Sequence, residues 1–325
     1  MRPRAGAAGI LGGFVISVLV LTRNAPQLTA NCLRSLLACA PVLESAAGGA
    51  EFILVDDCSD PGRETLPLLR AFRDDAEPAS TTVIRFRRQM QYAHGLAYGM
   101  SLARGDRGVL FVSQDMVLPP ACAAELLAVA AADECIGAVR PTSQHMDWAK
   151  PMVQAPPPGT ARTFGDLAAF AEQVRATRGG EAVDWPMLIG DAMLVTRALI
   201  DRIGVFDTRF YAYMADVDYG IRLHRAGFRH VIAPGAWLHH EGEGTAKETA
   251  ATGGATMPEY SRRMLAEVAA AYEQFRQKWG GENLPPTFRE MKRHHFEALH
   301  ARPAELPGDA VQPPLQLSDD VAEVF

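Results

Sequence analysis

The chain has 325 residues, of which 48% are hydrophobic and 22% charged, so it can bury a full core as an ordinary folded protein. Its formal net charge of -6 argues against a general grip on nucleic acid, which needs a basic face. The five cysteines form no CxxC pair and are odd in number, so neither a zinc site nor a disulfide framework is predicted. These features are typical of a reduced, cytosolic protein.

The N-terminal apolar run, from Ile10 to Leu21, follows Arg2 and Arg4 and so imitates a signal peptide. It is too short to span a bilayer, and no small-residue cleavage site follows it. We interpret it as a buried first strand.

Apolar strands alternate with helices from this run onward. Each predicted strand is followed by apolar residues at helical spacing, as at Leu28, Leu33 and Leu36. Strands that are apolar throughout and alternate with helices are typical of a mostly parallel α/β sheet covered on both faces. Strands are expected at 14–21, 52–55, 81–86, 108–115, 135–140 and 186–195, an irregular loop at 146–160, and late helices at 261–279 and 288–299.

Polar side chains lie at or just beyond the ends of three predicted strands, namely Asn24, Asp57 and Asp115. Each alone is a common turn former. In parallel sheets, however, ligands bind outside the carboxyl ends of the strands, so the three together indicate a site. Asp115 is well placed as a hard oxygen ligand for Mg²⁺ or Mn²⁺, with capping of the next helix as the alternative.

A carboxylate pair, Asp216 and Asp218, begins a helical pattern within the stretch from Tyr211 to Thr245. Two residues apart on a helix places the side chains about 200° apart around the axis, so only one faces a given pocket. We assign Asp216 as a general base and Asp218 as its structural or acceptor-binding neighbour. The alternative is that both are first-turn acids favoured by the helix dipole.

A histidine pair, His239 and His240, ends a strand-like run. Because adjacent residues on a strand face opposite ways, only one of them is expected to meet a metal. Gly190 is expected where another group approaches the backbone closely. Residues 190–193 and the 246–258 loop are our candidates for the acceptor side.

In these motifs the chain resembles the family 2 glycosyltransferases with a GT-A fold, especially the rhamnosyltransferase-like members of bacterial polysaccharide assembly. The resemblance covers roughly 15–280 and depends on the order of its motifs. They are VISVLVLTRN, ILVDDCSD, AYGMSLARGD before VLFVSQD, IGVFDTRFYAYMADVDYGIRLHRAG, and HHEGEGT with a late KWG.

The resemblance implies a nucleotide pocket in which Asp57 hydrogen-bonds the uracil or thymine of the donor. Thr22 and Asn24 would line the same pocket. The DXD metal motif of the family would fall on Ser113 and the two residues after it.

In that motif Gln114 and Asp115 fill the second and third positions, and Asp115 matches the metal-binding acid. Asp216 matches the catalytic Asp of the ED motif. His240, rather than His239, matches the late metal-binding histidine because its HxGxxT spacing fits better.

Several positions depart from the family pattern. Ser113 replaces the first acid of DXD, and Ala215 replaces the Glu of ED. Gln91 stands where many relatives carry Gly, and Asp191 replaces a common Ala. These departures motivate one alternative, a nucleotide-sugar-binding scaffold with impaired catalysis. A nucleotidyltransferase is disfavoured because TRNAPQL lacks the glycines of a phosphate-cradling loop.

We therefore expect an inverting glycosyltransferase that uses Mn²⁺ or Mg²⁺ and a UDP- or dTDP-sugar. The expected acceptor is a saccharide or lipid-linked saccharide in cell-envelope or exopolysaccharide biosynthesis, and Gly190, Asp191 and Asp218 are its candidate binding residues.

The expected domain organisation is a GT-A catalytic domain over 1–245, with a nucleotide-binding half at 14–118 and an acceptor half at 119–245. A mobile loop and C-terminal helices follow at 246–300, and then a disordered tail at 301–325. The expected location is cytoplasmic, where a lipid-linked acceptor would draw the enzyme to the inner face of the membrane.

Overall fold

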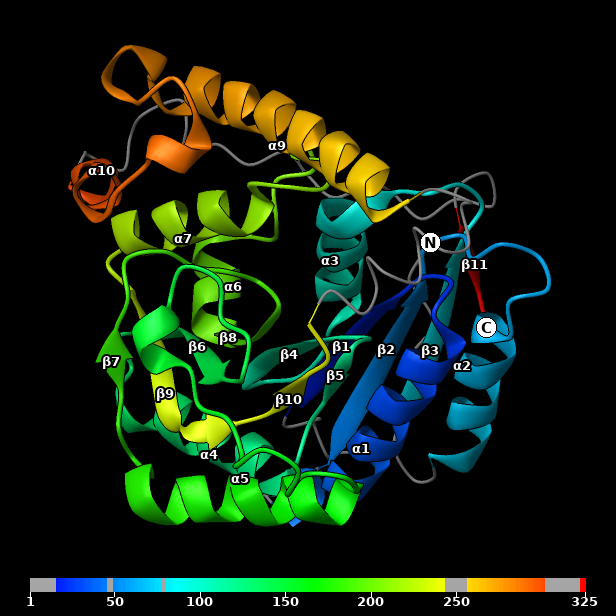
Figure 1. Cartoon of the computed structure of the whole chain (residues 1–325). Coiled ribbons are helices and arrows are strands. Elements are labelled where there is room, and N and C mark those ends of the chain that lie inside the picture. The colour runs from blue at the N-terminus through cyan, green and yellow to red at the C-terminus, as the bar shows by residue number, and fades with distance from the viewer. Residues whose placement is uncertain (1–15, 46–48, 77–79, 243–255, 302–321) are drawn as a thin grey trace, which may run out of the picture.

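The structure is a computed structural model that describes residues 16–45, 49–76, 80–242, 256–301 and 322–325, and these form an α/β fold (Figure 1). Strands and helices alternate through the first half, as the sequence predicts. The elements are β1 (Ile16–Thr22), α1 (Pro26–Ser45), β2 (Ala50–Asp56), α2 (Thr65–Asp75), β3 (Ser80–Phe86), α3 (Gln91–Leu102), β4 (Gly108–Ser113), β5 (Met116–Val117) and α4 (Pro120–Ala132).

Strand β1 is buried on both faces. It pairs in parallel with β2 and with β4, and β2 pairs in parallel with β3. Val18 and Val20 pack in one hydrophobic cluster, with residues of α1 and α4, while Leu19 packs in the cluster on the other face, with residues of α3. Because neither face meets water, the residues from 18 to 21 are all apolar, and the buried hydroxyls of Ser17 and Thr22 are hydrogen-bonded. The parallel pairing brings the loops after β1, β2 and β4 to one edge of the sheet.

The second half of the sheet is mixed. Strand β8 runs antiparallel to both β4 and β6, and β7 runs antiparallel to β9. The strand predicted at 186–195 begins only at Ala192, because residues 186–191 have no regular structure. The elements are β6 (Ile136–Thr142), α5 (Phe164–Arg178), β7 (Val183–Asp184), β8 (Ala192–Thr196), α6 (Arg197–Ile203), α7 (Ala215–Arg225), β9 (Arg229–Trp237) and β10 (His239–His240).

The C-terminal elements are α9 (Met257–Trp279), α10 (Arg293–His300) and β11 (Ala322–Val324). Short 3-10 turns lie at Lys150–Met152, Gly281–Asn283 and Phe288–Glu290. The strand order in the described part of the main sheet is β11-β3-β2-β1-β4-β8-β6-β9-β7, and β10 pairs separately with β5. The predicted mostly parallel α/β sheet with C-terminal helices is confirmed.

The last residues differ from the disordered tail expected at 301–325. Ala322 to Val324 form an edge strand that pairs antiparallel with β3, with Ala322 opposite Phe86. The outer edge of β3 has backbone N–H and C=O groups that can pair with a further strand. The sequence of the tail alone does not indicate that the tail supplies this strand. Residues 302–321, and the start of the predicted 246–258 loop through 255, lie outside the described residues.

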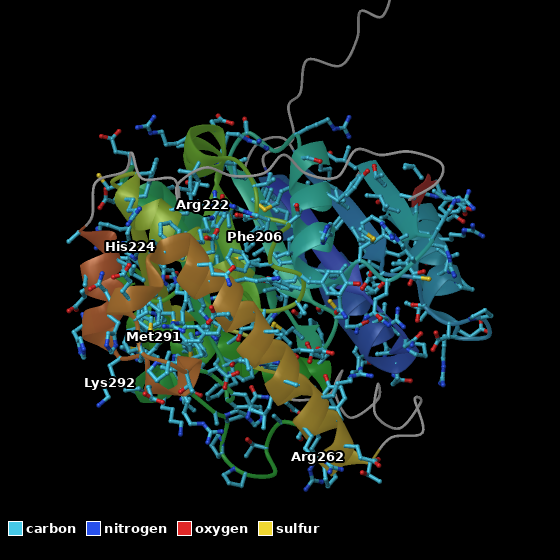
Figure 2. The ribbon with its side chains drawn as sticks, turned by 90° about the horizontal axis from the view of Figure 1, so that it is seen from above. Phe206, Arg222, His224, Arg262, Met291 and Lys292 are labelled. Carbon is cyan, nitrogen blue, oxygen red and sulfur yellow. The ribbon has the colours of Figure 1, made fainter. Side chains whose placement is uncertain are left out.

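Helix α9 lies across the molecule above α7 and the N-terminal start of α3 (Figure 1). Seen from above, it runs diagonally over the ribbon from the end marked by Arg262 (Figure 2). Among the helices in the described ranges, none has both the length and the apolar character needed to cross a bilayer.

Candidate functional site

A first cavity of about 330 Å³ opens where the loops after β1, β2 and β4 meet. The start of α3, strand β10 and the N-terminal half of α9 close it from other sides. The predicted residues Thr22, Asp57, Ser113, Gln114, Asp115 and His240 all line it.

The Asp57 carboxylate holds the turn before α3. One oxygen accepts a hydrogen bond from the Met90 backbone N–H at 2.6 Å, and the other accepts from the Gln91 N–H at 3.0 Å. Burial raises the pKa of Asp57 although both N–H groups oppose the rise. Gln91 has a φ of 65°, in the left-handed region that favours glycine.

Thr22 lines the first cavity, whereas Asn24 does not. The Thr22 hydroxyl lines the cavity and donates to the Val55 carbonyl at 3.0 Å. Asn24 was expected in the same pocket but is not among its lining residues. Its amide nitrogen donates to the Asp60 carboxylate and its amide oxygen accepts from the Asp60 N–H, each at 2.7 Å. Asn24 is turned away because it fastens the loop after β1 to the loop after β2.

Asp115 and His240 come together although they are far apart in the sequence. The antiparallel pairing of β10 with β5 places the His240 Nε2 3.7 Å from the Asp115 Oδ2. Burial lowers the pKa of His240, but the Asp115 and Asp191 carboxylates and the His145 carbonyl together outweigh it, so the net shift is upward. The pair offers one oxygen and one nitrogen donor, a combination that suits Mn²⁺.

His239 faces away from Asp115, so of the two candidate metal-binding histidines only His240 lines the first cavity. The His239 Nδ1 lies 2.8 Å from the Gln144 Nε2, and its Nε2 lies 3.1 Å from the Glu241 carboxylate. The two histidines diverge because neighbours on a strand face opposite sides.

Gln114, which directly follows β4, is fixed against the loop after β1 and the start of α1. Its side-chain oxygen accepts from the Arg23 N–H at 2.9 Å and from the Thr29 hydroxyl at 3.1 Å. Its side-chain nitrogen donates to the Arg23 carbonyl at 3.0 Å. Of the three DXD positions, only Asp115 therefore offers a carboxylate. Within the described ranges, no group of three or more His, Cys, Asp or Glu residues is arranged to hold a metal ion.

A second cavity, of about 970 Å³, lies between the start of α7, the segment before β8, and α9. The two cavities adjoin beneath α9 and are together called the cleft, because five residues line both: Tyr92, Ser113, Ala212, Tyr213 and Met264.

Asp216 lines the second cavity from the first turn of α7. Its Oδ2 accepts from the Gly190 N–H and its Oδ1 from the Val217 N–H, both at 2.9 Å. Burial raises the pKa of Asp216 although these N–H groups favour the ionised form, and the nearby Asp191 raises it further. Met214, which caps α7, has a φ of 69°, so the backbone is strained where it places this carboxylate.

Gly190 is approached as closely as the sequence predicts. The Tyr92 hydroxyl donates to its carbonyl oxygen at 2.6 Å. A Cβ added there would lie 1.8 Å from the Tyr92 hydroxyl oxygen and 3.2 Å from the Asp216 Cβ. Only glycine fits without displacing one of these side chains.

Asp191 also lines the second cavity and is paired with a buried arginine. The Arg140 Nη2 lies 2.6 Å from the Asp191 Oδ2, and its Nε donates to Oδ1 at 2.9 Å. Arg140 is only 1% exposed, so Asp191 is its essential counter-charge.

Asp218 does not reach the cleft, which corrects its candidate role in acceptor binding and favours the structural alternative. It is fully buried and accepts from the Arg222 Nε at 3.0 Å and from the Trp279 Nε1 at 3.0 Å. Lys278 Nζ lies 2.6 Å from Asp218 and 2.8 Å from the buried Asp207. Lys and Trp of the KWG motif thus fasten the end of α9 to α7 and to the residues before it.

Sequence reasoning missed several residues that form the cleft. Tyr92 and Tyr213 line both cavities, and burial raises the pKa of Tyr213 to about 12. Arg23 and Arg263 bring positive charge to the first cavity. The motif around Tyr213 offered a signal, whereas a basic residue such as Arg263 on a late helix usually belongs to a solvated face.

Residues 13–270 match a family model described as Glycosyltransferase like family 2, and the chain belongs to this family. Its fold is the GT-A α/β fold expected from the sequence; the sheet and the family match define it.

Two curated relatives are the N-acetylglucosaminyl-diphospho-decaprenol L-rhamnosyltransferases of Mycobacterium tuberculosis strains CDC 1551 / Oshkosh and ATCC 25618 / H37Rv. Each is 39% identical to this chain over 79 residues, which is 24% of this chain and 25% of the relative. The chain thus matches about a quarter of the length of these relatives.

Similar solved structures include a mannosyltransferase from Pyrobaculum calidifontis in complex with GDP-Man and Mn²⁺. It has 18% identity and a TM-score of 0.49, with 88% of this chain and 86% of that chain covered. Residues 1–349 of TarS from S. aureus have 15% identity and a TM-score of 0.49, with coverages of 88% and 69%.

Proposed function

We propose that the protein is an inverting, metal-dependent glycosyltransferase that moves a sugar from a UDP- or dTDP-sugar to a hydroxyl of an acceptor. The observation that carries the proposal is that the Asp115–His240 pair and Asp216 line two adjoining cavities. Family membership supports the reaction class. The acceptor we propose is a saccharide or lipid-linked saccharide in cell-envelope or exopolysaccharide biosynthesis. The lipid-linked class is supported by the name of the mycobacterial relatives, which contains N-acetylglucosaminyl-diphospho-decaprenol.

The first cavity is the proposed donor site. Thr22, Asp57 and Ser113 would contact the nucleoside, and Asp115 with His240 would hold Mn²⁺ or Mg²⁺. When bound, the ion neutralises the negative charge that accumulates on the leaving diphosphate. Two protein ligands leave coordination positions for diphosphate and water oxygens.

Positive side chains support the placement of the diphosphate in this cavity. Arg23 lies on the loop after β1, where its Nη1 donates to the Asp57 carbonyl at 2.8 Å. Arg263 reaches the same cavity from α9. Charges of this kind favour the binding of diphosphate oxygens.

Asp216 is the proposed general base. Its carboxylate would take the proton from the acceptor hydroxyl as the hydroxyl oxygen bonds to the anomeric carbon. The bond from that carbon to the diphosphate oxygen breaks in the same step, and the electron pair leaves with the diphosphate. A raised pKa makes a carboxylate a stronger base near neutral pH, while the N–H groups of Gly190 and Val217 keep it ionised and in place.

The acceptor would enter from the second cavity, past Gly190 and Asp191. This arrangement fits a nucleotide-binding half at 14–118 and an acceptor half at 119–245, with α9 covering both. We propose that the enzyme acts in the cytoplasm, at the membrane surface when its acceptor carries a lipid.

The donor site is tested by calorimetric binding of UDP, dTDP and GDP, each with Mn²⁺ and with EDTA. A pyrimidine diphosphate should bind the wild type only with Mn²⁺ and should not bind Asp115→Ala. Asp106→Ala, which removes an exposed carboxylate far from the cleft, is the matched control and should bind like the wild type. Tightest binding of GDP would refute the pyrimidine donor, and no nucleotide binding at all would refute the donor site.

One observation favours a second candidate, a nucleotide-sugar-binding scaffold with impaired catalysis. Ser113 and Gln114 carry no carboxylate, so the DXD segment contributes only that of Asp115, and the Gln114 amide is held by Arg23 and Thr29. A scaffold would bind nucleotide without turnover in an assay of UDP or dTDP release. Loss of biological function in Asp216→Asn with unchanged nucleotide binding would count against it.

A further inference from the structure

Trp148 combines two features that cost free energy. Its backbone φ is 57°, in the left-handed region that bulky residues avoid, and its side chain is 41% exposed. A large aromatic residue that is both strained and exposed requires an explanation, because neither feature serves the core.

The residues around Trp148 are firmly anchored, so its exposure does not come from a loose loop. Met146 and Ala149 are buried and pack together with Ile232. Arg140, which forms an ion pair with Asp191, also donates a hydrogen bond from Nη1 to the Asp147 carbonyl at 3.3 Å. The backbone before the indole is therefore tied to the same arginine that pairs with a residue of the second cavity.

The segment is also fastened at its other end to the proposed metal site. The Gln144 side chain donates to the His240 carbonyl at 2.6 Å. The short run from 144 to 149 thus connects both parts of the cleft, and Trp148 lines the second cavity together with Asp216.

Trp148 is one member of an aromatic wall. Its ring centroid lies 5.1 Å from that of Phe288, with the planes tilted by 52°, and Phe288 in turn lies 5.6 Å from Tyr272 of α9. Charged side chains share this cavity with the wall, namely Asp147, Asp191 and Arg289. At about 970 Å³, the cavity is at the upper end of the usual range of about 300–1,000 Å³ for small-molecule sites.

We propose that Trp148 is the stacking platform for a sugar ring of the acceptor and thereby a determinant of acceptor specificity. This proposal rests on the proposed function, and it narrows the class of acceptor to one that presents a sugar ring to Trp148. The faces of a sugar ring carry C–H groups, which suit the negative face of an indole. The ring hydroxyls point outward, where Asp147, Asp191 and Arg289 provide acceptors and donors of hydrogen bonds. A purely apolar chain would instead desolvate these charges without compensation.

The test uses Trp148→Gly, which removes the indole and tolerates the positive φ without strain. Trp148→Asn, which also tolerates this backbone, is the second variant, and Trp148→Phe keeps an aromatic face. Phe164→Ala is the matched control, because Phe164 is 40% exposed but lies on α5 outside the second cavity. Saturation-transfer NMR with UDP and Mn²⁺ present would measure binding of the methyl glycosides of glucose, galactose, mannose and N-acetylglucosamine, and of farnesyl phosphate.

At least one methyl glycoside should bind the wild type and the Phe164 and Trp148→Phe variants. Its affinity should fall about tenfold or more in Trp148→Gly and Trp148→Asn. The melting temperature of Trp148→Gly should not fall below that of the Phe164 variant. If the indole had only a structural role, its removal would lower the melting temperature further than the control substitution does.

Equal glycoside binding by Trp148→Gly and the wild type would overturn the proposal. So would the absence of glycoside binding to the wild type, or binding of farnesyl phosphate alone with loss in Trp148→Gly, which would indicate a lipid groove. Calorimetry of UDP and dTDP binding on the same samples distinguishes failure of the role proposed for Trp148 from failure of the proposed function. If nucleotide binds, only the role of Trp148 fails; if neither nucleotide nor glycoside binds, the proposed function fails as well.

Discussion

Lys278→Met should release the end of α9 that covers the cleft. The Lys278 ammonium is 4% exposed and lies 2.8 Å from Asp207 and 2.6 Å from Asp218, both fully buried. Removing one partner of a buried ion pair costs about 3–5 kcal/mol. We expect the lower end of that range, about 3 kcal/mol, because Asp207 keeps Arg209 and Asp218 keeps Arg222.

The loss is measured by thermal and urea unfolding monitored by circular dichroism. In a chain of 325 residues, 3 kcal/mol corresponds to a fall in Tm of roughly 4 °C. Lys292→Met is the control, because Lys292 is exposed and its charge is solvated. Since α9 lines both cavities, Lys278→Met should also weaken calorimetric UDP binding. Equal melting temperatures for the two methionine variants would refute the view that this buried network fastens α9.

Asp216→Asn should lower kcat by about 10²–10⁴-fold while leaving UDP affinity unchanged, because it removes the proposed base and keeps the shape; unaltered UDP-release kinetics would exclude the role. Gly190→Ala should lower the free energy of urea unfolding by about 1–3 kcal/mol, because the added Cβ would overlap with Tyr92. Gly165→Ala is the control and should be tolerated, because its Cβ would lie 3.6 Å from its nearest neighbour. Equal urea midpoints for the two variants would contradict this prediction. Burial lowers the pKa of His230 to about 3. Stability should therefore fall as the pH drops below about 6.5, since the unfolded chain then binds a proton that the fold excludes, and the loss from this residue at pH 5 should be about 2 kcal/mol. Urea midpoints at pH 7 and 5 should differ less in His230→Phe, and an unchanged difference would rule this out.

The order of strands and helices in the first half was predictable because it depends on local periodicity. An apolar run such as 16–22 is a strand buried on both faces wherever it lies in the sheet. Parallel pairing then brings the ends of β1, β2 and β4 to one edge, so Asp57 and Asp115 were predictable as neighbours. Strand alternation likewise required that His239 and His240 diverge. The need for glycine at 190 was also visible in the sequence.

Only the tertiary structure determined which partners each side chain contacts across the fold. The sequence shows two aspartates at the start of α7, but the buried ammonium of Lys278 makes Asp218 structural and leaves Asp216 facing the cleft. Helix α9 looks like any amphipathic helix until that ion pair places it over the cavities. In the sequence, Trp148 is part of an irregular loop, and only the folded chain places it in the second cavity together with Asp216. Periodicity is set by neighbours along the chain, whereas burial and charge pairing depend on contacts between segments that only folding brings together.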